Sequence, residues 1–224
     1  MHLNIKIILC MYFSCTMIEW ILHSKVMHGN PTSIKKIPFI GKLLSKTAQD
    51  HLNHHNEVNM DMTMSHVNEN ANGLIFTWAT TFIVTLVLYG SNNLLFKLTD
   101  TQISSKNKIL YAVITGVLYS MIWNTIHVNM HNVQYKVKAK QGILNFKPSK
   151  NHNNLYKYLW QYHAIHHLQK GGKKNFNIVL PGFDWLMGTY QNKCFDNTKY
   201  CMENKADHRC KIRQHDCLTN NEIM

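Results

Sequence analysis

Ten of the fifteen histidines in this sequence fall into four short clusters, each next to an apolar segment. The clusters read HSKVMH, HLNHH, HVNMH and HAIHH, which gives the pattern HX4H, HX2HH, HX3H and HX2HH. Neutral imidazole is a ligand of intermediate softness that suits iron, zinc and copper. The clustered residues are His23, His28, His51, His54, His55, His127, His131, His163, His166 and His167.

The spacing within these clusters, called boxes below, indicates metal binding. Residues i, i+3 and i+4 share one face of a helix, so HX2HH points two or three imidazoles the same way and HX3H points two. Ten imidazoles exceed the capacity of one ion, because zinc takes about four ligands and octahedral iron about six. The pattern therefore predicts two metal ions. No box contains cysteine and HExxH is absent, which disfavours structural zinc and a metalloprotease.

Three apolar segments must position the boxes: residues 3–22, 70–96 and 109–135. The second and third contain no Asp, Glu, Lys or Arg over 27 positions each, and about 20 apolar residues span a bilayer core. With the polar link 97–108 between them, they predict a helical hairpin through a membrane; two buried helices of a soluble all-α protein are the alternative. The first segment reads as a signal peptide or a retained span, and the lack of a small-residue cleavage site favours the span.

The net charge of +12 arises from 24 basic and 12 acidic residues. Fifteen basic residues follow His131 and only three lie between Leu74 and His131, so the charge flanks the apolar segments. No zinc-finger, RNA-recognition or OB-type signature appears, and we expect no nucleic-acid partner. With three spans, residues 23–73 and those after 131 lie on one side, which the positive-inside tendency assigns to the cytoplasm.

The four boxes in this order, with a hairpin between the second and third, resemble the fatty acid hydroxylase / sterol desaturase superfamily. The stretches EWILHSKVMHG and HAIHHLQKGGKKNFNIVLPGFDWLMGTY are similar to the first box region and the closing region of that family. The resemblance covers about residues 15–190. It implies an all-α integral membrane protein with about three transmembrane segments and a helical histidine-box domain facing the cytoplasm, in an endoplasmic reticulum-type membrane.

The resemblance also implies a non-haem di-iron oxygenase that uses O2 and two electrons to hydroxylate or desaturate a lipid C–H bond. Carried over residue by residue, the metal ligands are the ten clustered histidines, and the cofactors are two iron ions; relatives have been described with zinc in these sites. The box pattern favours a fatty acyl chain or ceramide from the bilayer as substrate. A sterol desaturase or sterol methyl oxidase is the alternative, and a non-catalytic histidine-rich metal-binding protein is another. No HPGG haem motif is present, so a separate cytochrome b5-type donor is expected.

We predict one domain over residues 1–190 and a flexible polar tail over 191–224. The tail would present a metal-binding stripe only if it were helical, because four of its residues are seven apart: Cys194, Cys201, His208 and His215. Beyond the last box we expect a solvated glycine turn at 170–174, and an interfacial segment around Trp185. Three polar residues there either hold imidazole N–H groups or cap loops: Asn175, Asn177 and Asp184.

Overall fold

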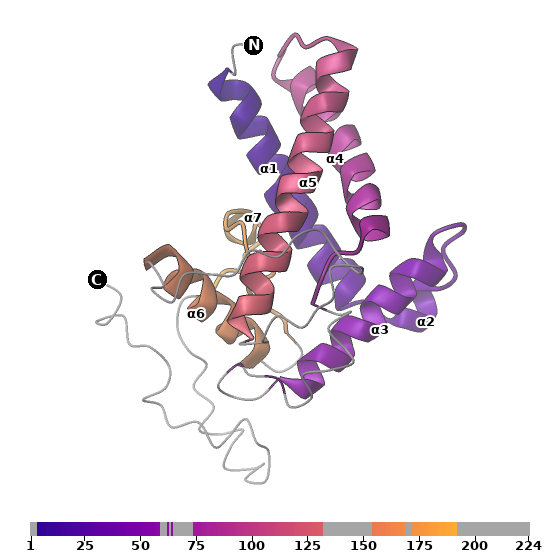
Figure 1. Ribbon diagram of the computed structural model, residues 1–224, viewed down its shortest axis with the longest axis vertical. Helices are drawn as coiled ribbons and strands as arrows, with labels where there is room; N and C mark the ends of the chain where they lie inside the picture. The colour runs from indigo at the N-terminus through magenta and orange to yellow at the C-terminus, as the bar shows by residue number, and fades with distance from the viewer. Residues whose placement is uncertain are drawn as a thin grey trace.

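The computed structural model describes residues 4–58, 62, 64, 74–131, 154–168 and 172–191. Within these residues the regular structure is helical, with one isolated antiparallel bridge between Val58 and Met64. The elements are α1 (Ile5–Ile21), η1 (Leu22–Met27), α2 (Pro31–Ile34), α3 (Gly41–Glu57), α4 (Trp78–Leu98), α5 (Ser105–Met130), α6 (Asn154–Leu168) and α7 (Phe183–Leu186). The all-α prediction is confirmed. Figure 1 shows α1, α4 and α5 along the long axis, with α3, α6 and α7 towards one end.

Three helical stretches are long and apolar enough to cross a membrane: Ile5–Met27, Trp78–Leu98 and Ser105–Met130. The prediction of three spans is confirmed, with different boundaries. The second span begins at Trp78 instead of residue 70, because the Thr77 side chain accepts a hydrogen bond from the Thr80 N–H (3.2 Å) and caps the helix there. The third ends at Met130 instead of residue 135.

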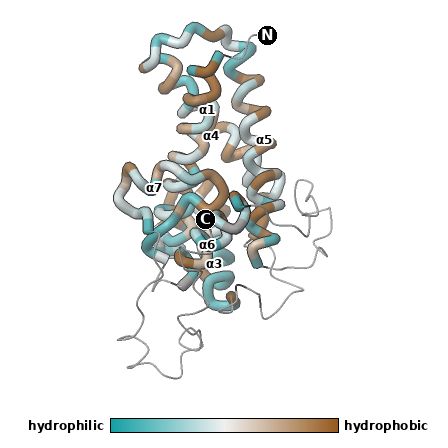
Figure 2. Tube along the Cα trace, turned by 90° about the vertical axis from the view of Figure 1, so that its left-hand side faces the viewer, coloured by the Kyte–Doolittle hydropathy of each residue, from teal (hydrophilic) through white to brown (hydrophobic). Residues whose placement is uncertain are grey.

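The three long helices carry apolar side chains outward as well as inward. Their exposed residues include Leu9, Phe82, Leu86, Leu94, Val113 and Leu118. Figure 2 shows hydrophobic stretches along all three helices. A helix that is apolar on every side belongs in a protein core or a membrane, and within the described part of the chain these outward faces are exposed. The chain is an integral membrane protein.

The spans approach one another closely through small residues. A Cβ atom added at Gly116 of α5 would lie 2.1 Å from the Thr85 Oγ1 of α4, so any other residue would force Thr85 or the helices to move. The Ser91 hydroxyl of α4 donates a hydrogen bond to the Ser14 hydroxyl of α1 (3.1 Å). Small residues therefore set the spacing of the spans.

The largest buried apolar cluster joins the spans to the segments that follow α6. It includes Ile18 from α1, Leu88 from α4, Trp123 from α5, Leu159 from α6 and Ile178 from the following segment. Burial of such side chains contributes roughly 1.5–3 kcal/mol each. This core holds the box-bearing ends of η1, α5 and α6 close together.

Candidate metal centre

The structure brings the ten histidines of the four boxes together in two groups of five. In each group, one ring nitrogen from every member lies within 4.8 Å of the others. The first group is His23, His28, His51, His55 and His166, and the second is His54, His127, His131, His163 and His167. Among the described residues, neither group includes cysteine, aspartate or glutamate. Each group is a compact set of imidazoles that could hold one metal ion.

The two HX2HH boxes each contribute to both groups. On α3, His51 and His55 are four residues apart and belong to the first group, whereas His54 belongs to the second. On α6 the arrangement is reversed, since His163 and His167 belong to the second group and His166 to the first. Helical periodicity places i and i+4 on one face, and the intervening residue projects to the side. The two boxes therefore link the groups.

The first box depends on a π-helix. Its two histidines are five residues apart, and an α-helix would not put them on one face. Residues Leu22–Met27 form the π-helix η1, in which the His28 N–H donates to the His23 carbonyl (3.0 Å). Hydrogen bonds from i to i+5 define this geometry, and π-bulges occur frequently at functional sites. The π-turn brings His23 and His28 into the same group.

Most of the ten imidazoles are buried, and only His28 and His55 are partly exposed. Loss of contact with water lowers the pKa of His51, His54 and His163 well below the usual range, and neighbouring imidazoles lower it further. The same causes lower the pKa of His28 to about 3. Neutral imidazole is the form that binds metals. Burial therefore keeps these rings in the metal-binding state.

Four backbone carbonyls fix the orientation of four rings. His23 Nδ1–H donates to the Phe176 carbonyl (2.7 Å) and His166 Nδ1–H to the Lys174 carbonyl (2.7 Å). In the second group, His127 Nδ1–H donates to the Leu74 carbonyl (3.1 Å) and His131 Nδ1–H to the Met62 carbonyl (2.9 Å). A carbonyl only accepts, so these contacts place the proton on Nδ1 and leave Nε2 with a bare lone pair.

The Nε2 atoms face one another at distances that fit a shared cation. His23 and His51 are 3.0 Å apart at Nε2, and His131 and His163 are 2.8 Å apart. Two lone pairs so close repel unless a proton or metal ion lies between them. Nitrogens bound about 2.1 Å from one ion, at right angles to each other, lie about 3.0 Å apart. The observed separations fit several imidazoles around one ion.

The second group also holds buried ring nitrogens without a hydrogen-bond partner in the described part of the chain. Both nitrogens of His54 and the Nε2 of His127 are in this state. Leaving a buried polar atom unsatisfied costs about 1–3 kcal/mol. A metal ion would satisfy His127 Nε2 and one of the two His54 nitrogens, since each imidazole offers it one ligand atom. The donor set and the unpaired nitrogens both fit a metal at this position.

Asp184 holds the backbone that supports His23. This carboxylate is 1% exposed and accepts from the N–H of Phe176 (3.1 Å) and Asn177 (2.7 Å) and from the Tyr162 hydroxyl (2.6 Å). The Phe176 carbonyl in turn accepts from His23. Asp184 thus orients His23 through the peptide unit between Phe176 and Asn177.

Glu19 fixes the same segment to α1. Its buried carboxylate accepts from the N–H of Val179 (2.9 Å) and Leu180 (3.2 Å). The Asn177 side chain adds a bond to the Thr16 carbonyl (2.7 Å). These contacts tie the residues after the last box to the helix that leads into the first box.

Gly172 packs directly on the first group. Its φ is +55°, and a Cβ atom there would lie 2.3 Å from His28 Cε1 and 3.1 Å from His166 Cε1. The sequence predicted only a solvated turn around this residue. The structure shows that Gly172 closes over two imidazoles, a role that neither its residue type nor its position in the sequence indicates.

The three polar residues after the last box do not bond to imidazoles within the described structure. Asn175 bonds to the Tyr162 carbonyl (3.1 Å), and Asn177 and Asp184 bond to backbone groups, to each other and to hydroxyls. The imidazole partners are carbonyl groups, which every residue carries. The Cys/His stripe of the predicted tail and the remaining histidines, His2, His66, His152, His208 and His215, lie outside the described residues.

The sequence matches the fatty acid hydroxylase family over residues 8–189. No curated protein and no solved structure matches the chain. The matched region covers well over half of the sequence and contains all four boxes, the second and third candidate spans and all but the first three residues of the first span. The chain belongs to the fatty acid hydroxylase family.

Proposed function

We propose that this member of the fatty acid hydroxylase family is a membrane-bound di-iron oxygenase that hydroxylates a lipid C–H bond, on a fatty acyl chain or a ceramide. The observation that carries the proposal is the pair of five-histidine groups at the ends of the candidate spans. The donor set is all nitrogen, which suits iron. Bound iron would supply the activation of O2 that an unactivated C–H bond requires.

The ten histidines are the proposed ligands, five for each ion. Backbone carbonyls such as those of Phe176 and Leu74 hold the rings in one tautomer, with Nε2 towards the ion. Burial keeps the rings neutral and excludes bulk water. In the overall reaction the C–H bond breaks and a C–OH bond forms. O2 is reduced by two electrons from a donor together with the two electrons of the C–H bond, and two protons complete one water.

The position of the centre supports the proposed substrate and electron donor. The first and third boxes lie at the ends of the spans that finish in η1 and α5, and the histidines of α3 and α6 join them there, so a lipid would reach the centre from the bilayer. The basic residues on the box side suit an acidic cytochrome b5-type donor. We place the boxes on the cytoplasmic side of an endoplasmic reticulum-type membrane.

The test is expression in a yeast lacking its own sphingolipid fatty acid hydroxylase, followed by mass spectrometry of the extracted lipids. We expect acyl chains heavier by one oxygen atom, absent from cells that express His166→Ala. His152→Ala, outside the boxes, is the matched control and should keep the product.

Each alternative has its own result. Altered sterols with an unchanged acyl profile would replace the acyl substrate by a sterol. An unchanged lipid profile in cells whose purified protein carries two metal ions would contradict the oxygenase and leave a metal-binding membrane protein. Product formation by His166→Ala would show that the ligand assignment is wrong.

A further inference from the structure

The turn between α2 and α3 exposes a cluster of large apolar side chains. Phe39 is fully exposed at 106%, and Ile37 and Ile40 are 44% and 43% exposed. The turn has a defined shape, because the Gly41 N–H donates to the Ile37 carbonyl (3.0 Å) and the Ile40 N–H to the Pro38 carbonyl (2.7 Å). Apolar groups gathered at one point of a surface mark an interaction site.

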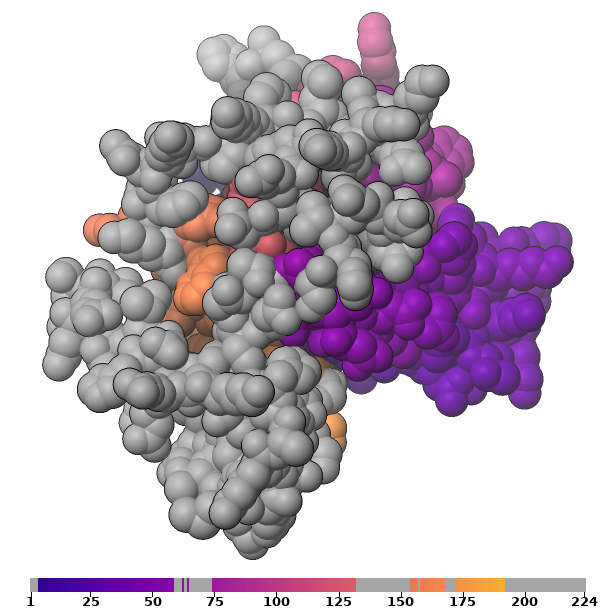
Figure 3. Space-filling view, turned by 60° about the horizontal axis from the view of Figure 1, so that its bottom comes forward, coloured from indigo at the N-terminus to yellow at the C-terminus, as the bar shows by residue number. Residues whose placement is uncertain are grey.

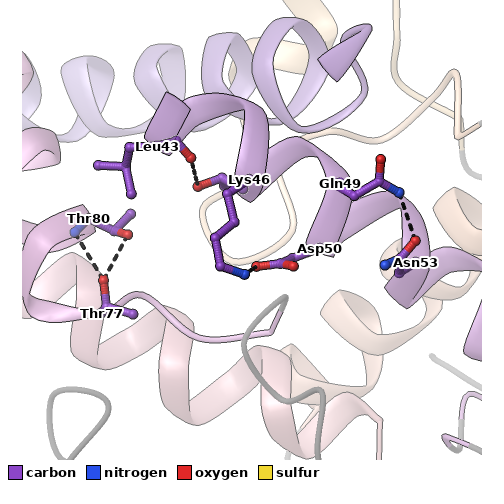
Figure 4. Close-up of polar contacts among 8 residues, drawn as sticks. Leu43, Lys46, Gln49, Asp50, Asn53, Thr77 and Thr80 are labelled. Carbon is purple, nitrogen blue, oxygen red and sulfur yellow. Dashed lines mark hydrogen bonds and ion pairs between the residues drawn. The ribbon is translucent and has the colours of Figure 1, made fainter. Parts of the chain in front are cut away.

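Basic residues surround this apolar tip. Lys35 and Lys36 precede it and Lys42 follows it, and all three are exposed. Farther along α3 the exposed polar residues pair with each other: Lys46 binds Asp50 (2.7 Å) and Gln49 donates to Asn53 (2.9 Å), as Figure 4 shows. The exposed surface therefore changes, within about two turns, from lysines beside apolar residues to polar side chains that pair with one another. This arrangement is complementary to an anionic membrane surface. The apolar side chains can contact acyl chains, and the surrounding lysines can bind the negatively charged phosphates of the headgroups.

The position of the tip in the molecule agrees with contact to the membrane surface. Figure 3 shows the α2–α3 hairpin projecting from the body of the molecule. In Figure 1 the tip lies near the level at which α4 begins, with α7 on the opposite side of the long helices. α4 begins at Trp78, which is 61% exposed, and α7 exposes Trp185 at 58%. Tryptophan is enriched at the level of lipid headgroups.

We propose that the α2–α3 tip is a lipid anchor: Ile37, Phe39 and Ile40 insert among the acyl chains, and Lys35, Lys36 and Lys42 bind anionic headgroups. The helix that follows the tip, α3, begins at Gly41 and carries His51. Ten residues at 1.5 Å each place His51 about 15 Å along the helix from Gly41. Anchoring the start of α3 therefore fixes the height of the second box above the bilayer. This surface is separate from the metal centre, and the inference stands whatever the reaction is.

The test places a photo-crosslinking amino acid at position 39 of the full chain, with position 49 as the matched site on the polar part of α3. The protein is reconstituted in nanodiscs of phosphatidylcholine containing phosphatidylserine, irradiated and analysed by mass spectrometry. We expect lipid adducts at position 39, enriched in phosphatidylserine, and few or no lipid adducts at position 49.

Removal of the lysines tests the headgroup contact. In Lys35→Gln/Lys36→Gln/Lys42→Gln the phosphatidylserine preference at position 39 should fall, by up to about fivefold for each lysine. An unchanged preference would overturn the role of the lysines. Protein–protein adducts at position 39, or equal lipid labelling at positions 39 and 49, would overturn the anchor itself. An unchanged melting temperature of each variant shows that the fold is intact.

Discussion

Single atoms decide whether the two histidine groups can hold metal. A ring whose Nδ1–H is donated to a carbonyl has one lone pair left, on Nε2. His23 and His131 are such rings, and each directs that lone pair at the Nε2 of another histidine about 3 Å away. Such a contact is favourable when the facing ring donates an Nε2–H, or when a cation lies at the centre of the group. The convergence of five imidazoles in each group is therefore the main physical argument for two bound ions.

Gly172 offers the sharpest test at this scale. Gly172→Ala should displace His28, because the new Cβ would lie 2.3 Å from His28 Cε1. We expect the metal content to fall from about two ions per chain to about one, as the loss of one site implies. The measurement is elemental analysis of purified protein.

Gly188 provides the matched control for this change. Its φ is +65°, close to that of Gly172, but a Cβ there would meet nothing within 4 Å. Gly188→Ala carries the same backbone strain without the collision and should keep its metal. An equal loss in both variants would show that strain, and not contact with His28, is the cause.

The helices α3 and α6 distribute their histidines between the two groups, and this division can be tested with double variants. His51→Ala/His55→Ala removes two ligands from the first group and should leave about one ion per chain. His54→Ala/His55→Ala removes one ligand from each group and should leave about none if each ion needs its five ligands. Equal metal content in the two double variants would contradict the division of the second box.

The crossing of α4 and α5 predicts a stability difference between two glycines. Gly116→Ala puts a Cβ 2.1 Å from Thr85 Oγ1, and such overpacking costs about 1–3 kcal/mol. Gly90→Ala, also in a helix, meets nothing within 4 Å and should be neutral or stabilising by about 1 kcal/mol. Melting curves in detergent compare the two. A lower melting temperature for Gly90→Ala than for Gly116→Ala would contradict the close crossing.

The helices show which features can be predicted from sequence patterns and which cannot. The apolar runs predicted three spans, because length and composition decide whether a helix crosses a membrane. Their ends shifted by several residues, since caps such as Thr77 act locally and compete with the apolar pattern. The π-helix of the first box was not predicted, because a single i+5 pair does not distinguish it from an α-helix.

At the scale of the whole molecule, metal binding should stabilise the fold, because the groups join η1, α3, α5 and α6. A ligand at a thousand times its Kd contributes about 4.1 kcal/mol of stability. Chelation should therefore lower the melting temperature of the wild type clearly. The same treatment should leave His54→Ala/His55→Ala unchanged. A shift of equal size in both proteins would show that the chelator acts elsewhere.

The ten histidines that the structure brings together are those that the sequence singled out, because box spacing and box order are properties of the sequence. Their sorting into two groups required three-dimensional packing, since residues from all four boxes meet only in the fold. The carbonyl partners of His127 and His131 could not be predicted, because every residue carries a carbonyl and only the fold selects one. Gly172 could not be predicted either, because only the fold brings it against His28 and His166.

The most direct test of the central claim is the number and kind of metal ligands in the purified protein. Elemental analysis combined with X-ray absorption at the metal edge measures both. Two groups of five histidines predict about two ions per chain, with nitrogen ligands and no sulfur. A single ion per chain, or sulfur bound to the metal, would contradict the account.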